Sequence, residues 1–146
     1  MRRRDERGQA TIMIVGFAVV LAMAVALVVD ASAAYLQRQA LDTLADGAAL
    51  RGADLAATGR ETYTQGLPPE RLGLTSAAAR AGVHDYLVDV GAYAAYPGLR
   101  WSVAVDPVTD SLTVRIEAPL DLPLTVPGSP DTTRVGATGS AVVMTD

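Results

Sequence analysis

The chain has 146 residues, no cysteine, a single histidine and a formal net charge of −4. This length fits one domain, and the absence of cysteine excludes a disulfide framework, a thiolate metal site and a thiol nucleophile. The acidic balance excludes the basic surface that nucleic-acid phosphates require, so we predict no nucleic-acid partner.

An uncharged apolar run extends from Ala10 to Val29. As a helix it spans about 30 Å, the thickness of the hydrocarbon core of a bilayer. Arginines are concentrated before the run, and an excess of arginine in a short flank marks the cytoplasmic side. We therefore predict a single-pass protein of the cytoplasmic membrane. Residues 1–9 form a cationic cytoplasmic tail, residues 10–29 form the transmembrane helix, and the bulk of the chain lies outside the cytoplasm.

The same run has the outline of a cleavable secretory signal, because Ala31-Ser32-Ala33 satisfies the A-x-A pattern. However, the run is longer than the roughly 7 to 15 apolar residues of a signal peptide, and A-x-A arises easily in an alanine-rich stretch. The anchor is therefore the preferred interpretation. Release of a secreted soluble protein after Ala33 stays open as the alternative.

Helical composition continues beyond the apolar run. The sequence after Asp30 is rich in Ala and Leu, and no proline occurs before Gly66. We predict one helix from about Ala10 to about Thr58, stopped by Gly59, so that residues 30–59 extend the helix outside the membrane. Apolar residues at a seven-residue spacing form a seam that we expect to pack on the chain's own sheet or on a partner helix. The seam consists of Ala34, Leu41, Ala48 and Leu55, with Leu44 between them.

Small residues form a second pattern inside the apolar run. Ala18, Ala22 and Ala26 recur every four residues, so they share one helix face along which another helix can approach closely. We predict that this face packs on other helices, which leaves a homo-oligomer through the helix open. Asp30 continues the stripe at the outer boundary, where its carboxylate reaches water, and we interpret it as marking the exit of the helix.

Residues 60–146 are predicted to form a small α+β ectodomain. The segment from Glu61 to Glu70, with its Pro68-Pro69 pair, is typical of an exposed connection. Thr75 or Ser76 is expected to cap a second helix that ends near Gly91. Its apolar face is predicted to consist of Ala79, Val83, Tyr86, Leu87 and Val90.

Alternating apolar and polar residues predict strands after this helix. Leu99 to Val105 and Leu112 to Ala118 form a hairpin around a turn at residues 106–110. The alternation continues from Leu120 to Val126, but three prolines restrict that piece to an edge strand or an extended loop, and a last strand runs from about Thr133 to Met144. The fold class is therefore α+β and pilin-like. A long N-terminal transmembrane helix continues outside the membrane, followed by a short helix and an antiparallel sheet of three or four strands.

Patterns that carry catalysis are missing from the sequence. His84 stands alone, whereas a zinc site needs three or four suitable ligands. Phosphate-binding, dinucleotide-binding and G-x-S-x-G motifs do not occur. We predict no enzymatic activity, no cofactor and no metal, and an envelope hydrolase is the less favoured alternative.

A set of short motifs in a fixed order resembles a known family. Arg7-Gly8 precedes the apolar run, Asp30 and Tyr35 follow it, and an alanine-rich segment around Asp46 closes it with the sequence ADGAALRGA. Over about residues 4–53 this order is similar to the N-terminal segment of the TadE/TadG-like Flp pilus assembly proteins. The resemblance implies a pilin-like or pseudopilin-like structural component of a bacterial tight-adherence (type IVc) pilus or a related secretion apparatus, with other subunits of that apparatus as partners.

One position departs from the pattern of type IV prepilins. Those precursors carry a glycine before the cleavage site and a glutamate five residues after it, whereas the fifth residue after Gly8 is Met13. The departure favours an uncleaved, TadG-like assembly or anchoring protein over a filament-forming major pilin. Processing after Gly8 stays open as the alternative.

Overall fold

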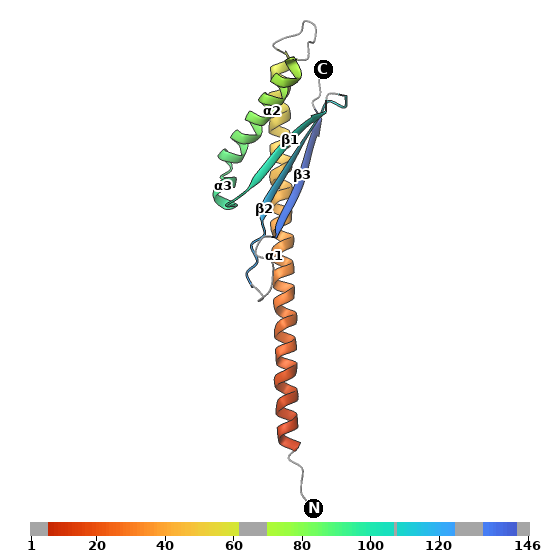
Figure 1. Ribbon diagram of the computed structural model, residues 1–146, viewed down its shortest axis with the longest axis vertical. Helices are drawn as coiled ribbons and strands as arrows, with labels where there is room; N and C mark the ends of the chain where they lie inside the picture. Colours follow the sequence, from red (N-terminus) through yellow and green to blue (C-terminus); the bar gives the residue numbers. More distant parts are fainter. Residues whose placement is uncertain (1–5, 62–69, 107, 125–132, 143–146) are drawn as a thin grey trace, which may run out of the picture. The chain divides into compact units, whose positions relative to one another are not determined.

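A single helix makes up the N-terminal part of the chain. The computed structural model describes residues 6–61, 70–106, 108–124 and 133–142. Helix α1 runs from Glu6 to Glu61, and its 56 residues extend over about 84 Å (Figure 1). The predicted long helix is confirmed, but it passes through Gly59 instead of stopping there. One glycine costs a helix only about 1 kcal/mol relative to alanine, which does not end a helix of this length.

The chain divides into two compact units. The first unit contains residues 1–35 and 121–129, of which residues 6–35 and 121–124 are described. The second unit contains residues 36–120 and 130–146, and it holds the remainder of α1, two further helices and the sheet.

Helix α2 spans Glu70–Asp89, so it begins earlier than the sequence predicts. Thr75 and Ser76 lie inside the helix, and the prediction that one of them caps it was wrong. Of the predicted connection from Glu61 to Glu70, residues 62–69 lie outside the described residues, and the two end residues belong to α1 and α2.

The C-terminal end of α2 lies close to the predicted position. The helix ends at Asp89, and Gly91 adopts a left-handed conformation with φ of 68°, which glycine accepts without a steric penalty. Ala79, Val83 and Leu87 are fully buried and Tyr86 is half-buried, but Val90 lies in the turn beyond the helix and is 48% exposed. Its assignment to the buried face was therefore wrong. A four-residue helix that the sequence did not predict, α3 (Ala92–Ala95), follows Gly91.

The sheet contains the three predicted strands: β1 (Arg100–Asp106), β2 (Ser111–Pro119) and β3 (Arg134–Val142). Both pairings are antiparallel, and the order is β1-β2-β3 (Figure 1). The register aligns Val103 with Val114 and Val114 with Gly139. In the turn between β1 and β2, the Val108 N–H donates a hydrogen bond of 2.9 Å to the Asp106 carboxylate.

The segment after β2 does not continue as a strand. β2 ends at Pro119, and residues 120–124 are irregular, which agrees with the extended-loop alternative that the prolines allow. The remainder of the predicted alternation, at residues 125–126, and the end of the predicted last strand, at residues 143–144, lie outside the described residues. With its long apolar helix, shorter helix and small antiparallel sheet, the fold is α+β as predicted.

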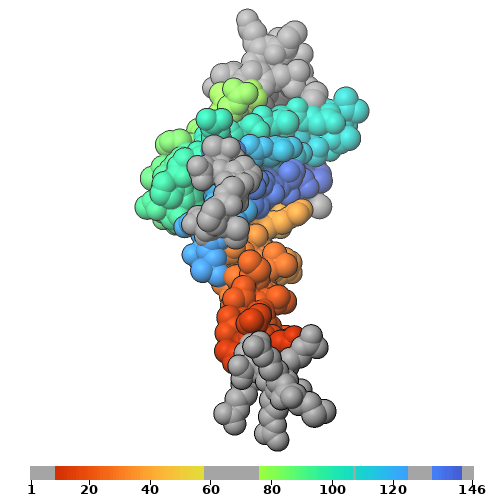
Figure 2. All heavy atoms as spheres, turned by 60° about the horizontal axis from the view of Figure 1, so that its bottom comes forward, coloured from red at the N-terminus to blue at the C-terminus, as the bar shows by residue number. Residues whose placement is uncertain are grey.

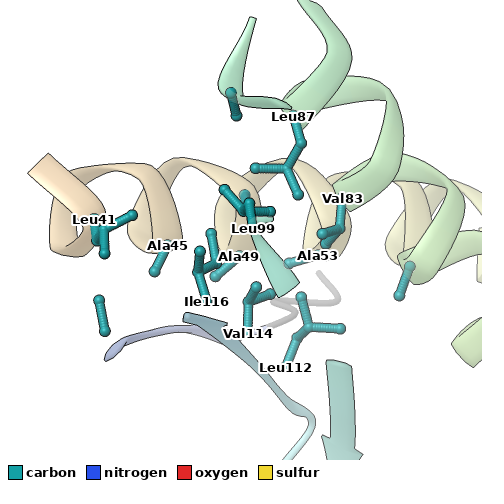
Figure 3. Packing of buried hydrophobic residues seen from close by; sticks show 14 of the residues in the cluster. Leu41, Ala45, Ala49, Ala53, Val83, Leu87, Leu99, Leu112, Val114 and Ile116 are labelled. Carbon is teal, nitrogen blue, oxygen red and sulfur yellow. The ribbon is translucent and has the colours of Figure 1, made fainter. Parts of the chain in front are cut away.

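The hydrophobic core of the second unit lies between α1, α2 and one face of the sheet (Figure 3). The helix α1 supplies mainly small residues to it, whereas α2 and β2 supply large ones. Leu112, Val114, Ile116 and Ala118 on β2 are fully buried, which matches the predicted alternation along this strand. The largest fully buried side chains are those of Leu41, Leu87, Leu112, Ile116, Val83 and Val114.

Candidate functional site

The first part of α1 exposes large apolar side chains. Ile12, Phe17 and Leu27 are 75%, 69% and 72% exposed, and the other large residues of the apolar run are exposed as well. In Figure 2 this part of the helix, coloured red to orange, has its side chains at the molecular surface. By length and composition α1 is apolar enough to cross a membrane. Exposure of such a continuous apolar surface to water is unfavourable, so the surface marks a contact with lipid or with other proteins.

The predicted small-residue stripe lies within this exposed part. Ala18 and Ala22 are exposed, and Ala26 is half-buried. The stripe is thus available for contact along the described helix, and its role in helix packing stays a prediction.

The second part of α1 is packed by the chain's own residues. Leu41 and Ala48 of the seam are fully buried, whereas Ala34, Leu44 and Leu55 are half-buried. Packing accounts for the composition of the alanine-rich motif, because the motif is buried against the sheet and α2 (Figure 3). Its buried residues are Ala45, Ala48, Ala49, Gly52 and Ala53. Small residues are needed where backbones approach this closely.

Glycines on three elements mark the closest of these approaches. A Cβ atom added to Gly139 of β3 would collide with the backbone of Ala45 and Asp46 on α1. A Cβ atom added to Gly82 of α2 would lie 3.3 Å from the Cα atom of Gly52 and 2.9 Å from the Leu55 side chain. Sequence reasoning identified neither Gly82 nor Gly139, because an isolated glycine does not reveal which distant backbone passes beside it.

Family-motif residues occupy different environments. Asp30 is half-buried, and its Oδ1 atom accepts a hydrogen bond of 3.1 Å from the Leu124 N–H in the first unit. Tyr35 is 67% exposed and Asp46 is exposed. Arg7 and Gly8 lie in the first turns of α1. The partner of Asp30 was not predicted, since 94 residues separate it from Leu124 in the sequence.

The described residues hold no cluster that could bind a metal ion. His84 is exposed on α2, where its Nδ1 atom lies 3.4 Å from Asp85 Oδ1 and its ring lies 6.2 Å from that of Tyr93. Asp106 is the one described carboxylate with a clear shift: hydrogen bonds from the Val108 N–H and then from the Thr109 side chain hold its pKa below the ordinary value of 3.8. These interactions of His84 and Asp106 join residues that are close in the sequence, and among the described residues they bring no further titratable group to either side chain than those named.

Comparison with known proteins gives one result that agrees with the motifs. No curated protein and no solved structure matches the chain. One family model does match, and the match covers both the exposed and the packed part of α1. It begins four residues later than the resemblance predicted from the motifs. Residues 8–57, about a third of the chain, match the model of the Tad family of Flp pilus-assembly TadE/G-like proteins, which confirms the predicted resemblance.

Proposed function

We propose that the protein is a membrane-anchored structural subunit of a Flp/Tad pilus assembly or related secretion apparatus, and that it acts by helix packing rather than by catalysis. The observation that carries this proposal is the division of one helix. Large apolar side chains are exposed before Asp30, whereas small residues are buried from Leu41 to Ala56. A helix with this division can join a lipid-embedded assembly at one end and position a folded unit at the other.

The proposed orientation follows from charge. Arg2, Arg3 and Arg4 precede the apolar run, so the N-terminus lies in the cytoplasm and the residues after Asp30 lie outside it. The missing glutamate at Met13 supports an uncleaved anchoring protein. Its partners are other subunits of the apparatus, and contact between copies through the exposed helix is part of the proposal.

Photo-crosslinking tests the packing. A photoreactive residue replaces Val25, which is 56% exposed and lies beside the stripe on the helix surface. Changing Ala18, Ala22 and Ala26 to leucine fills the stripe and is expected to reduce crosslinking in native membranes at least fivefold. Ala24→Leu, a matched exchange on another side of the helix, is expected to leave it unchanged. Equal crosslinking in the triple variant and the wild-type chain would remove the stripe from the account.

The mass of the mature protein tests the anchor. The protein isolated from membranes is expected to retain its N-terminal residues. A chain beginning at Ala34 would replace the anchored subunit by a secreted protein, and a chain beginning at Gln9 would establish prepilin-type processing.

A further inference from the structure

A short segment of the first unit that contains two leucines is hydrogen-bonded to α1 beside the end of the apolar run. Residues 121–124 have the sequence Asp-Leu-Pro-Leu, and the Leu124 N–H donates its hydrogen bond to the carboxylate of Asp30. Asp30 directly follows Val29, the last residue of the run. Because the bond is 3.1 Å long, the backbone of Leu124 lies at the level on α1 where the apolar surface ends.

The composition of this segment suits the surface of a lipid bilayer. Leu124 is 42% exposed, as is Val29 on α1, and Leu122 is half-buried. Irregular backbone is not tolerated in the hydrocarbon region, because its N–H and C=O groups lack partners there. At the interface the backbone can be hydrated while leucine side chains reach the acyl chains. The one charged residue of the segment is the exposed Asp121, and the segment has no arginine or lysine to attract anionic headgroups, so only its leucines can hold it to lipid.

From these observations we propose that residues 121–124 form a second membrane contact, an interfacial strap that Asp30 holds at the outer surface of the bilayer. Its partner is the lipid surface, which Leu122 and Leu124 enter from the side of α1. The strap rests on the proposed membrane anchor, and it assigns to Asp30 the role of a positioning residue for the strap.

The absence of cysteine from the chain allows a direct depth measurement. Single-cysteine variants Leu124→Cys, Val20→Cys and Gln39→Cys of the full chain carry an environment-sensitive fluorophore in phosphatidylcholine–phosphatidylglycerol vesicles. The vesicles contain lipids with a nitroxide either near the headgroup or deep in the acyl chain. Gln39 is an exposed residue of α1 and lies about 13.5 Å along the helix beyond Asp30, so it reports on water.

We expect the shallow nitroxide to quench the label at position 124 at least twofold more strongly than the label at position 39. The deep nitroxide is expected to quench position 20 most strongly. If position 20 is not quenched, the anchor fails, and the strap fails with it. If position 20 is quenched but position 124 behaves like position 39, the anchor stands and the strap is wrong.

A pair of substitutions tests the role of Asp30. Asp30→Ala removes the acceptor of the Leu124 N–H, whereas Asp30→Asn retains a side-chain oxygen at the same place. In the Leu124→Cys background, Asp30→Ala is expected to reduce shallow quenching at least twofold and Asp30→Asn to preserve it. In the Val20→Cys background, neither substitution is expected to change quenching at position 20. Equal quenching in the alanine and asparagine variants would overturn the assignment of Asp30.

Discussion

Two stretches of the same helix differ in the size of their side chains and in whether the chain's own residues cover them. Residues 10–29 of α1 carry large apolar side chains, and these are exposed in the isolated chain. Apart from Leu41, the buried positions of residues 41–56, which face the sheet and α2, are occupied by alanine and glycine. The first stretch therefore needs lipid or other proteins to cover its apolar side chains, whereas the sheet and α2 of the same chain cover the second. Apolar composition alone does not distinguish them; the size of the side chains and the presence of a folded partner do.

The same leucine-to-alanine exchange in the two stretches is expected to show the largest difference in stability. Leu41→Ala removes a fully buried side chain and is expected to lower the free energy of unfolding by about 3 kcal/mol. Leu27→Ala removes a side chain that is 72% exposed and is expected to leave that free energy unchanged while weakening retention in membranes. Urea unfolding in detergent, followed by the fluorescence of the single tryptophan, measures the first effect. Equal losses of stability in both variants would contradict the division of α1.

Glycine-to-alanine exchanges that affect the two stretches are expected to differ in stability as well, by a smaller amount. Gly139→Ala places a Cβ atom against the backbone of Ala45, which cannot move as a flexible side chain would. The variant is expected to lose about 2 kcal/mol of stability by overpacking. Gly16→Ala, in the exposed stretch, meets no atom within 4 Å and is expected to cause no loss. The same urea titration compares them, and a stable Gly139→Ala protein would show that β3 does not press on α1.

The smallest effect lies outside both stretches, at the turn between β1 and β2. The pKa of Asp106 is held below its ordinary value by the hydrogen bond from the Val108 N–H, so the ionised carboxylate stabilises the folded state. That contribution is present above the unfolded pKa near 3.8 and is lost as the pH falls through the lower folded value. Asp106→Asn is expected to reduce the decline of stability between about pH 5 and about pH 3. An unchanged acid limb in the urea titrations would contradict this role.

Local patterns predicted the elements of this fold well. The long helix follows from an alanine-rich and leucine-rich sequence without proline, and the hairpin of β1 and β2 follows from strict alternation around Val103 and Val114. Helix ends were harder. Thr75 and Ser76 are good capping residues, yet they are also tolerated inside a helix, and the structure places both of them inside α2.

The close contacts could not be predicted in the same way. The motif around Asp46 signalled a family, but its small residues gave no indication that Gly139 and Gly82 would approach them. The bond between Asp30 and Leu124 joins residues that are distant in sequence and carry no mutual pattern. Such contacts depend on how the elements pack, and periodicity within one element does not contain that information.

The most direct test of the division of α1 is the labelling of single cysteines with a water-soluble maleimide in native membranes, with and without urea. We predict that Gln39→Cys reacts in both conditions, that Leu41→Cys reacts only in urea, and that Val20→Cys reacts in neither, because lipid rather than protein covers it. Reaction of Val20→Cys in native membranes without urea would contradict the account.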